Sequence, residues 1–233
     1  IVNDRLYVTD TSGNLFEYQF DVDNKRFILQ SDEPVIKINS PKRDRFYRMH
    51  YEGDRLLVSG GVNPLEPAYY PVTFMYMEQD GSWVNFDETQ VLAEYPQMNN
   101  VNALNIVQDP FDDRHFYGAV WRNGLHEYYT NDDGYLELQN FYNYYNSPIK
   151  NIDVPVYDPW NYTTCTALQY DMNGNLWMAN QHTDTIIRFI RPDGKWMSLF
   201  YPDIAETTNV FQYLFSSHDI NFLVSYQGDK SGF

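Results

Sequence analysis

Cysteine is almost absent from this chain, which excludes one common means of stabilising a fold. Cys165 is the single cysteine among 233 residues, so no disulfide can form within the chain. A chain without such bridges is compatible with the cytoplasm or with a bacterial envelope protein. We expect Cys165 to act as a small buried apolar residue rather than as a nucleophile.

Long apolar runs and positive charge are also scarce. No run approaches the roughly 20 apolar residues that a membrane-spanning helix needs. Asp and Glu number 32 against 16 Lys and Arg, a net charge of −16. Such a surface repels nucleic acid and anionic lipid, so neither is an expected partner. The chain does not begin with Met or with a leader peptide, and we interpret it as a mature or excised piece of something longer.

Helical periodicity is missing as well, and short apolar runs of strand length take its place. These runs are separated by Gly, Asn, Asp and Pro. Aromatic residues make up 18% of the chain, with 21 Tyr and 15 Phe. Because aromatic rings pack well on a pleated surface, this composition favours strands. The sequence predicts an all-β fold.

The apolar runs recur as a repeat. One run returns at intervals of 46 to 60 residues, each time after a polar turn. Its copies are Leu6–Thr9, Leu56–Ser59, Phe116–Ala119, Leu176–Ala179 and Phe222–Ser225. In most copies a second strand follows about ten residues later, and a short third strand closes the unit.

Four short antiparallel strands in one repeat are typical of a β-propeller blade. We predict one partial propeller domain over residues 1–233, with about four and a half blades from a larger, seven-bladed ring. The blade units are expected at about 1–40, 41–95, 96–150, 160–205 and 206–233. The first unit lacks an inner strand, and the last ends early.

Segments that interrupt the repeat are the places where we expect function. Residues 60–70 lengthen a hairpin loop, and residues 140–162 form a long connection rich in Tyr, Asn and Pro. Aromatic side chains in or near such loops can bind ligands, because they give a large contact area at low entropic cost. The candidates are Tyr69, Tyr70, Trp121 and Trp160. The alternative is that these rings fill gaps between blades.

Catalytic and metal-binding motifs are lacking. The string Asp171–Asn175 fails the EF-hand template, because the twelfth position of the loop is His182 rather than Glu. We predict a tight turn there instead, as at Asp10–Asn14. The five His residues form no zinc motif, and no nucleophile elbow or phosphate loop occurs. We therefore expect no enzyme activity, no catalytic residue, no metal and no cofactor.

Two resemblances extend this interpretation. The string Asp171–Ala179 resembles the repeat of two-component-regulator propellers, which form the periplasmic sensor halves of Bacteroidetes hybrid histidine kinases. The ordered set Ser59–Gly61, Gly81–Glu88, Gln108–Pro110, Tyr145–Pro148 and Asp193–Trp196 is similar to the N-terminal propeller of PorZ-type proteins. Those proteins belong to the type IX secretion system at the cell surface. No kinase core or helix-turn-helix is visible in the chain.

A third resemblance points to an enzyme. The unit from Asn175 to Gly194 is also similar to the repeats of streptogramin lyases, which use His and acidic residues with a divalent metal. Only His182 has a suitable place for that role.

The resemblances imply a non-catalytic propeller module in the periplasm or at the cell surface. They imply ligand or glycan sensing or protein scaffolding, with other envelope proteins, the rest of its own chain or an oligosaccharide as partners. A metal-dependent lyase is the alternative.

Overall fold

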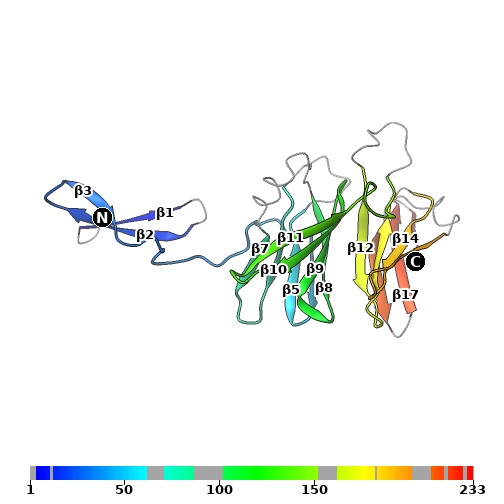
Figure 1. Cartoon of the computed structure of the whole chain (residues 1–233). Helices are drawn as coiled ribbons and strands as arrows, with labels where there is room; N and C mark the ends of the chain where they lie inside the picture. The colour runs from blue at the N-terminus through cyan, green and yellow to red at the C-terminus, as the bar shows by residue number, and fades with distance from the viewer. Residues whose placement is uncertain are drawn as a thin grey trace. The chain divides into compact units, whose positions relative to one another are not determined.

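The computed structural model of the chain describes residues 4–10, 13–61, 71–86, 102–151, 162–181 and 183–200, and the backbone of three later strands (Figure 1). All the regular elements in these ranges are β-strands, which confirms the predicted all-β class. Within them, no helix is long and apolar enough to cross a membrane. The chain divides into two compact units, residues 1–40 and 41–233.

The first unit is a small antiparallel sheet. Its strands β1 (Arg5–Thr9), β2 (Leu15–Asp21) and β3 (Arg26–Leu29) pair in the order β1-β2-β3. Leu15 also forms a bridge to Ile36, which fastens the segment after β3 to this sheet. Burial inside the unit is slight, since Val22 is 71% exposed and Ile36 is 55% exposed.

The second unit contains three four-stranded blades and one sheet of three strands. The first blade comprises β4 (Arg48–Glu52), β5 (Arg55–Ser59), β6 (Phe74–Met77) and β7 (Trp83–Phe86). The second comprises β8 (Ala103–Asp109), β9 (Asp112–Val120), β10 (Gly124–Thr130) and β11 (Tyr135–Tyr142). The third comprises β12 (Cys165–Tyr170), β13 (Leu176–Asn180), β14 (Ile187–Ile190) and β15 (Trp196–Leu199). The last sheet comprises β16 (Phe211–Ser217), β17 (Ile220–Gln227) and β18 (Lys230–Gly232).

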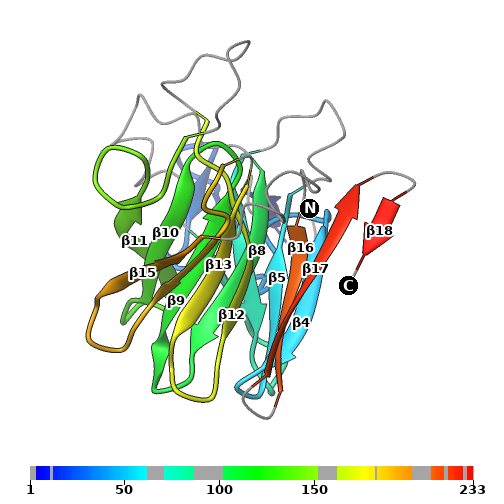
Figure 2. The ribbon, with the colours of Figure 1, turned by 90° about the vertical axis from the view of Figure 1, so that its right-hand side faces the viewer.

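Strands within each blade pair antiparallel, in sequence order. One contact between blades was not predicted: the outer strands β7 and β11 pair in parallel through Asn85 with Tyr135 and Phe86 with Leu136. The first two blades therefore form one eight-stranded sheet folded back on itself. The inner strands β8 and β12 lie near each other in the stack (Figure 2).

In the second and third blades, burial decreases from the inner strands to the outer ones, whereas the inner strand β4 of the first blade has no buried position. Strand β8 is buried at every position except its last, and β12 at every position but one. Strand β15 has no buried position. Inner strands covered on both faces are expected to carry nearly continuous apolar runs. The apolar runs of β8 and β12 therefore reflect the blades that pack on both of their faces.

Two apolar clusters hold neighbouring blades together. Phe116 of β9 belongs to the cluster between the first and second blades, with Phe74 and Tyr128. Tyr117, the next residue along, belongs to the cluster between the second and third blades, with Met178. Because successive side chains point to opposite faces of a strand, β9 contributes to both clusters.

Five hairpins share one turn geometry. In each, the amide of the first residue donates to the carbonyl four positions on, and a glycine amide donates back, at 2.8–3.1 Å. The glycine has a φ between 76° and 85°, where a side chain would be strained. The first residues of these turns are Asp10, Glu78, Asn131, Asp171 and Arg191.

The turn predicted at Asp171–Asn175 is confirmed. One carboxylate oxygen of Asp171 accepts the amides of Asn173 and Asn175 at 2.9 and 2.8 Å. The other accepts the Asn175 side-chain amide at 2.7 Å and the Trp177 indole N–H at 2.8 Å. Four donors use the full accepting capacity of the carboxylate. Asp171 is a turn residue.

Three inner strands carry a one-residue bulge that the sequence did not predict. The register against the neighbouring strand shifts between Ala103 and Asn105 in β8, between Thr166 and Gln169 in β12, and between Phe211 and Tyr213 in β16. Within the second bulge, Ala167 has a φ of 55°. A bulge increases local twist, which suits strands that surround a common axis.

Gly118 is predicted to set the spacing between the first two blades. A Cβ atom at this position would lie 2.5 Å from the ring of Phe74, which is fully buried. Gly118→Ala is therefore expected to lower the free energy of unfolding by about 1–3 kcal/mol, measured by urea denaturation. The double variant with Phe74→Leu should recover part of that loss. An unchanged unfolding midpoint for Gly118→Ala would refute this close packing.

Candidate functional site

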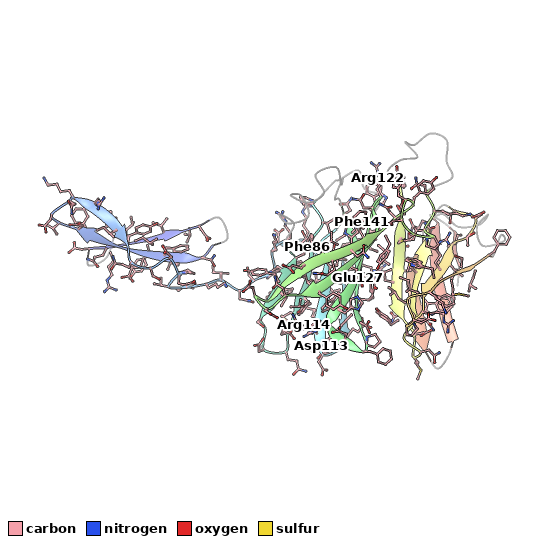
Figure 3. The ribbon with its side chains drawn as sticks, viewed as in Figure 1. Phe86, Asp113, Arg114, Arg122, Glu127 and Phe141 are labelled. Atoms are coloured by element: carbon pink, nitrogen blue, oxygen red, sulfur yellow. The ribbon has the colours of Figure 1, made fainter. Side chains whose placement is uncertain are left out.

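The antiparallel blades place their connections at two opposite ends of the strands. We call the end with the hairpins β4–β5, β6–β7, β8–β9, β10–β11, β12–β13 and β14–β15 the turn face. The end with the connections β9–β10, β11–β12 and β13–β14 is the loop face. Arg122 lies at the loop face, Asp113 and Arg114 lie at the turn face, and Glu127 lies between them (Figure 3).

The loop face carries a turn that exposes two tyrosine rings. We call residues 140–151, which begin with the last three residues of β11, the tyrosine turn. Tyr144 and Tyr145 are 52% and 61% exposed, and their rings meet edge to face with centroids 5.4 Å apart. Both residues belong to the segment that the sequence predicted as functional. Neither was among the predicted ligand contacts, although the run Asn140–Pro148 in the sequence contains both.

Hydrogen bonds close the tyrosine turn on itself. The Asn143 carbonyl accepts the Ser147 amide at 3.1 Å and the Ser147 hydroxyl at 2.7 Å. The side-chain oxygen of Asn146 accepts the Asn143 amide at 2.8 Å, and its side-chain nitrogen donates to the Phe141 carbonyl at 2.7 Å. Asn and Ser side chains that bond nearby backbone groups define a turn locally. The tyrosine rings therefore stand on an ordered backbone.

The far end of the tyrosine turn is anchored to the third blade. Ile149 is 1% exposed and packs in the cluster between the second and third blades. The amide of Lys150 donates to the Asn180 side-chain oxygen at 2.7 Å, and the Asn180 side-chain nitrogen donates to the Lys150 carbonyl at 3.0 Å. Lys150 also pairs with Asp184 at 2.6 Å. This anchoring ties the position of the turn to the blade stack.

One predicted ligand residue, Trp121, lies inside the described ranges. It is 7% exposed, and its ring meets the Tyr162 ring edge-on at a centroid distance of 6.0 Å. The Arg122 guanidinium lies 4.9 Å from each of these two rings. The burial of Trp121 favours its alternative interpretation as a residue that fills a gap between blades. Tyr69, Tyr70 and Trp160 lie outside the described residues.

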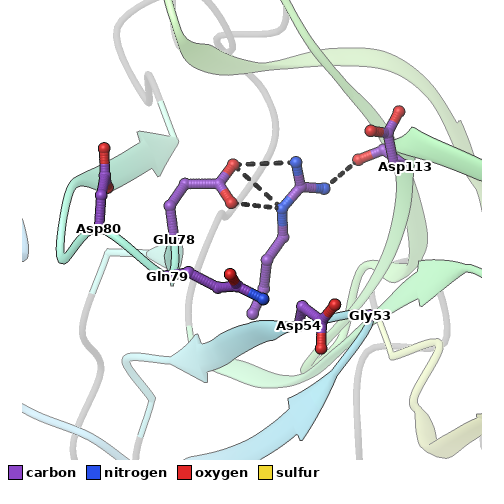
Figure 4. Close-up of a pocket in the computed structure, with 7 residues that line it drawn as sticks. Gly53, Asp54, Glu78, Gln79, Asp80 and Asp113 are labelled. Carbon is purple, nitrogen blue, oxygen red and sulfur yellow. Dashed lines mark hydrogen bonds and ion pairs between the residues drawn. The ribbon is translucent and has the colours of Figure 1, made fainter.

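The turn face contains a pocket of about 370 Å³, and two of the charged residues that line it, Arg55 and Glu78, are paired with each other (Figure 4). The guanidinium of Arg55 binds both carboxylate oxygens of Glu78 through its Nε, at 3.0 and 2.9 Å. Its Nη1 donates to the Gln108 side chain at 3.3 Å and to the Asp113 carbonyl. Arg55 therefore joins β5 and the turn after β6 of the first blade to β8 and β9 of the second.

A network of ionisable groups lies between the second and third blades. The two ring nitrogens of His115 bond Asp109 at 2.9 Å and Glu127 at 2.8 Å. The hydroxyls of Tyr117 and Tyr142 donate to Glu127 at 3.0 and 2.7 Å. The sequence placed His115 among ordinary strand histidines, because its partners stand 6 and 12 residues away.

Burial and pairing set the pKa values of this network. Burial opposes the charged form of His115, but the hydrogen bonds to Asp109 and Glu127 outweigh it and raise its pKa to about 9. Burial likewise opposes the charge on Glu127, but its bonds from His115, Tyr142 and Tyr117 hold its pKa below the usual value. The network holds an imidazolium between two carboxylates. The His115 ring is thus hydrogen-bonded to both carboxylates, Asp109 and Glu127.

Two other titratable groups are buried. His126 is fully buried, and burial lowers its pKa to about 3, so its ring is neutral. Cys165 is fully buried and free, and burial raises the pKa of its thiol to about 12. A protonated, inaccessible thiol matches the predicted apolar role of Cys165.

No group of three or more His, Cys, Asp or Glu side chains in the described ranges has an arrangement that could hold a metal ion. His182, the one residue with a place in the lyase alternative, lies outside those ranges.

Comparison with solved structures shows the fold. The chain is similar to PorZ, an essential bacterial surface component of the type IX secretion system of Porphyromonas gingivalis, with a TM-score of 0.72 and 20% identity. The match covers 97% of this chain and 29% of PorZ, so the chain spans under a third of that protein. The fold is a β-propeller. At this identity, the likeness shows the fold alone.

Two weaker matches are an extracellular domain of a two-component system and a lyase. The extracellular domain of a hybrid two-component system from Bacteroides thetaiotaomicron is 12% identical with a TM-score of 0.35, over 92% of this chain and 29% of that one. Virginiamycin B lyase from Staphylococcus aureus is 10% identical with a TM-score of 0.42, over 96% of this chain and 79% of that one. No family model and no curated protein matches the chain.

Arg55 is predicted to matter for stability far more than an exposed arginine on the same face. Its side chain is 14% exposed, and Arg55→Met would leave Glu78 without its partner. We expect a loss of about 2 kcal/mol in the free energy of unfolding, measured in urea. Arg114→Met is the matched control, because the Arg114 side chain is 54% exposed and a loss under about 1 kcal/mol is expected. Equal losses in the two variants would contradict this role of Arg55.

His115 and His126 predict a free energy of unfolding that is greatest near neutral pH. The folded-state pKa of His115 is raised from 6.5, so its stabilisation is complete below that value and is lost as the pH rises through about 9. The folded-state pKa of His126 is lowered from 6.5, so its contribution is complete above that value and is lost as the pH falls towards about 3.

Urea titrations on both sides of neutral pH measure the two effects. His115→Gln should abolish most of the alkaline decline, ~2 kcal/mol in the wild type, while the decline on the acid side remains. The acid-side decline is therefore an internal control for the variant. An alkaline decline of the same size in His115→Gln would show that other groups cause it.

Proposed function

We propose that the chain is a non-catalytic β-propeller module of a bacterial envelope protein that recognises its target through the loop face. The observation that carries this proposal is the tyrosine turn, in which an ordered backbone presents two exposed rings, Tyr144 and Tyr145. Exposed aromatic residues on rigid supports are frequent anchors in binding sites.

The occupied charges elsewhere support a binding role over catalysis. Arg55 is neutralised by Glu78, and His115 is held between Asp109 and Glu127. A general acid or base must exchange a proton with a substrate near the working pH. Groups that are paired with each other, and whose pKa values are shifted away from neutral pH, are better suited to stabilising the structure.

Two versions of the role follow from the resemblances. In one, the module belongs to a PorZ-like component of secretion or attachment at the cell surface. In the other, it belongs to the periplasmic sensor of a hybrid two-component protein that responds to a glycan. The content of the parent chain separates them, since a downstream kinase core would exclude the secretion version.

The proposal predicts binding without turnover. Calorimetry against a panel of oligosaccharides should show saturable binding, and chromatography of the same mixtures after long incubation should return the sugars unchanged. The lyase alternative is tested in parallel with a streptogramin B antibiotic and added Mg²⁺. Ring opening of the antibiotic, absent from a no-protein control, would overturn the non-catalytic proposal.

A further inference from the structure

Tyr144 and Tyr145 are exposed, whereas Tyr142 before them is half-buried and Ile149 after them is buried. Tyr142, two residues earlier, donates to Glu127 and packs edge to face with Trp196 at a centroid distance of 5.6 Å. Ile149, four residues after Tyr145, is buried between blades. Between these two packed residues, Tyr144 and Tyr145 are each more than half exposed.

An ordered platform lowers the cost of binding. Each large side chain that a ligand must immobilise costs about 0.5–1.5 kcal/mol. The backbone under the rings is held by the Asn143, Asn146 and Ser147 hydrogen bonds, and the ring planes are already inclined at 69° to each other. Two flat surfaces at such an angle can contact two successive units of a chain-like ligand.

The chemistry around the platform favours an uncharged ligand. The ammonium of Lys150 is paired with Asp184 at 2.6 Å, so it offers no free counter-charge to an anion. The net charge of −16 disfavours polyanions further. Tyrosine rings provide an apolar face and a hydroxyl, which match the apolar faces and hydroxyl groups of neutral sugars.

We propose that Tyr144 and Tyr145 stack on pyranose rings of a neutral polysaccharide and form a sugar-binding site on the loop face. This inference rests on the proposed function, because it gives the recognition module a ligand class and a location.

Calorimetric titration with maltohexaose, cellohexaose, xylohexaose and mannohexaose tests the site. The wild type should bind at least one of them, and Tyr144→Ala and Tyr145→Ala should each weaken that binding by roughly tenfold. Tyr144→Phe and Tyr145→Phe keep the ring and should stay within about threefold of the wild type. Tyr51→Ala is the matched control, because Tyr51 is 67% exposed on β4 of the same unit. Urea midpoints verify that every variant is folded.

The other outcomes overturn the site in distinguishable ways. Undiminished binding in both Ala variants would place the sugar elsewhere and leave the proposed function standing. A loss in the Phe variants as large as in the Ala variants would exclude ring stacking. If none of the sugars binds while Tyr145→Ala abolishes association with a partner protein, the surface recognises protein, and the sugar assignment is wrong. No binding of any kind would remove both proposals.

Discussion

The structure depends on a single constraint: each four-stranded blade has two apolar faces and has to bury both. A lone sheet exposes one face at least, and a few strands without a second layer are marginally stable. Strand β9 shows the solution, because Phe116 packs toward the first blade and Tyr117 toward the third. Full burial of a large apolar side chain contributes about 1.5–3 kcal/mol, so the stability of a blade depends on its neighbours.

The polar groups buried between stacked blades also need hydrogen-bond partners. Ser59 of β5 donates to the Leu104 carbonyl of β8 at 3.2 Å, and Asn105 of β8 donates to the Leu168 carbonyl of β12 at 3.0 Å. At both interfaces a side chain of one blade thus bonds an inner-strand carbonyl of the next. Arg55 pairs with Glu78 inside the first blade and also donates to Gln108 and to the Asp113 carbonyl of the second blade. A buried ion pair rarely adds net stability over an apolar pair, but the loss of one partner is costly. The bonds from Arg55 to the second blade therefore help to fix the position of one blade against the next.

Local patterns explain which parts of the fold were predictable. The hairpin at Asp171 is visible in the sequence, because its capping carboxylate and its glycine act within five residues. The His115 network is not visible, because it needs the three strands β8, β9 and β10 to pair in the correct register. The bulge near Ala167 and the parallel pair of β7 with β11 depend on packing between blades, which no local pattern encodes. For the same reason, the sequence could not show whether Trp121 is buried between blades or exposed in a loop.

The two faces of the blade stack are under different physical demands. On the turn face, glycine hairpins such as the one at Gly174 reverse the chain in the fewest residues, so their side chains mainly cap their own backbone. On the loop face, a connection has to cross from the outer strand of one blade to the inner strand of the next. The tyrosine turn satisfies this need with its own hydrogen bonds and with Ile149 as an anchor. Because these bonds and anchors hold the backbone, the exposed side chains of Tyr144 and Tyr145 can change without disturbing the apolar clusters between blades. Recognition can therefore diversify on this face at little cost to the fold.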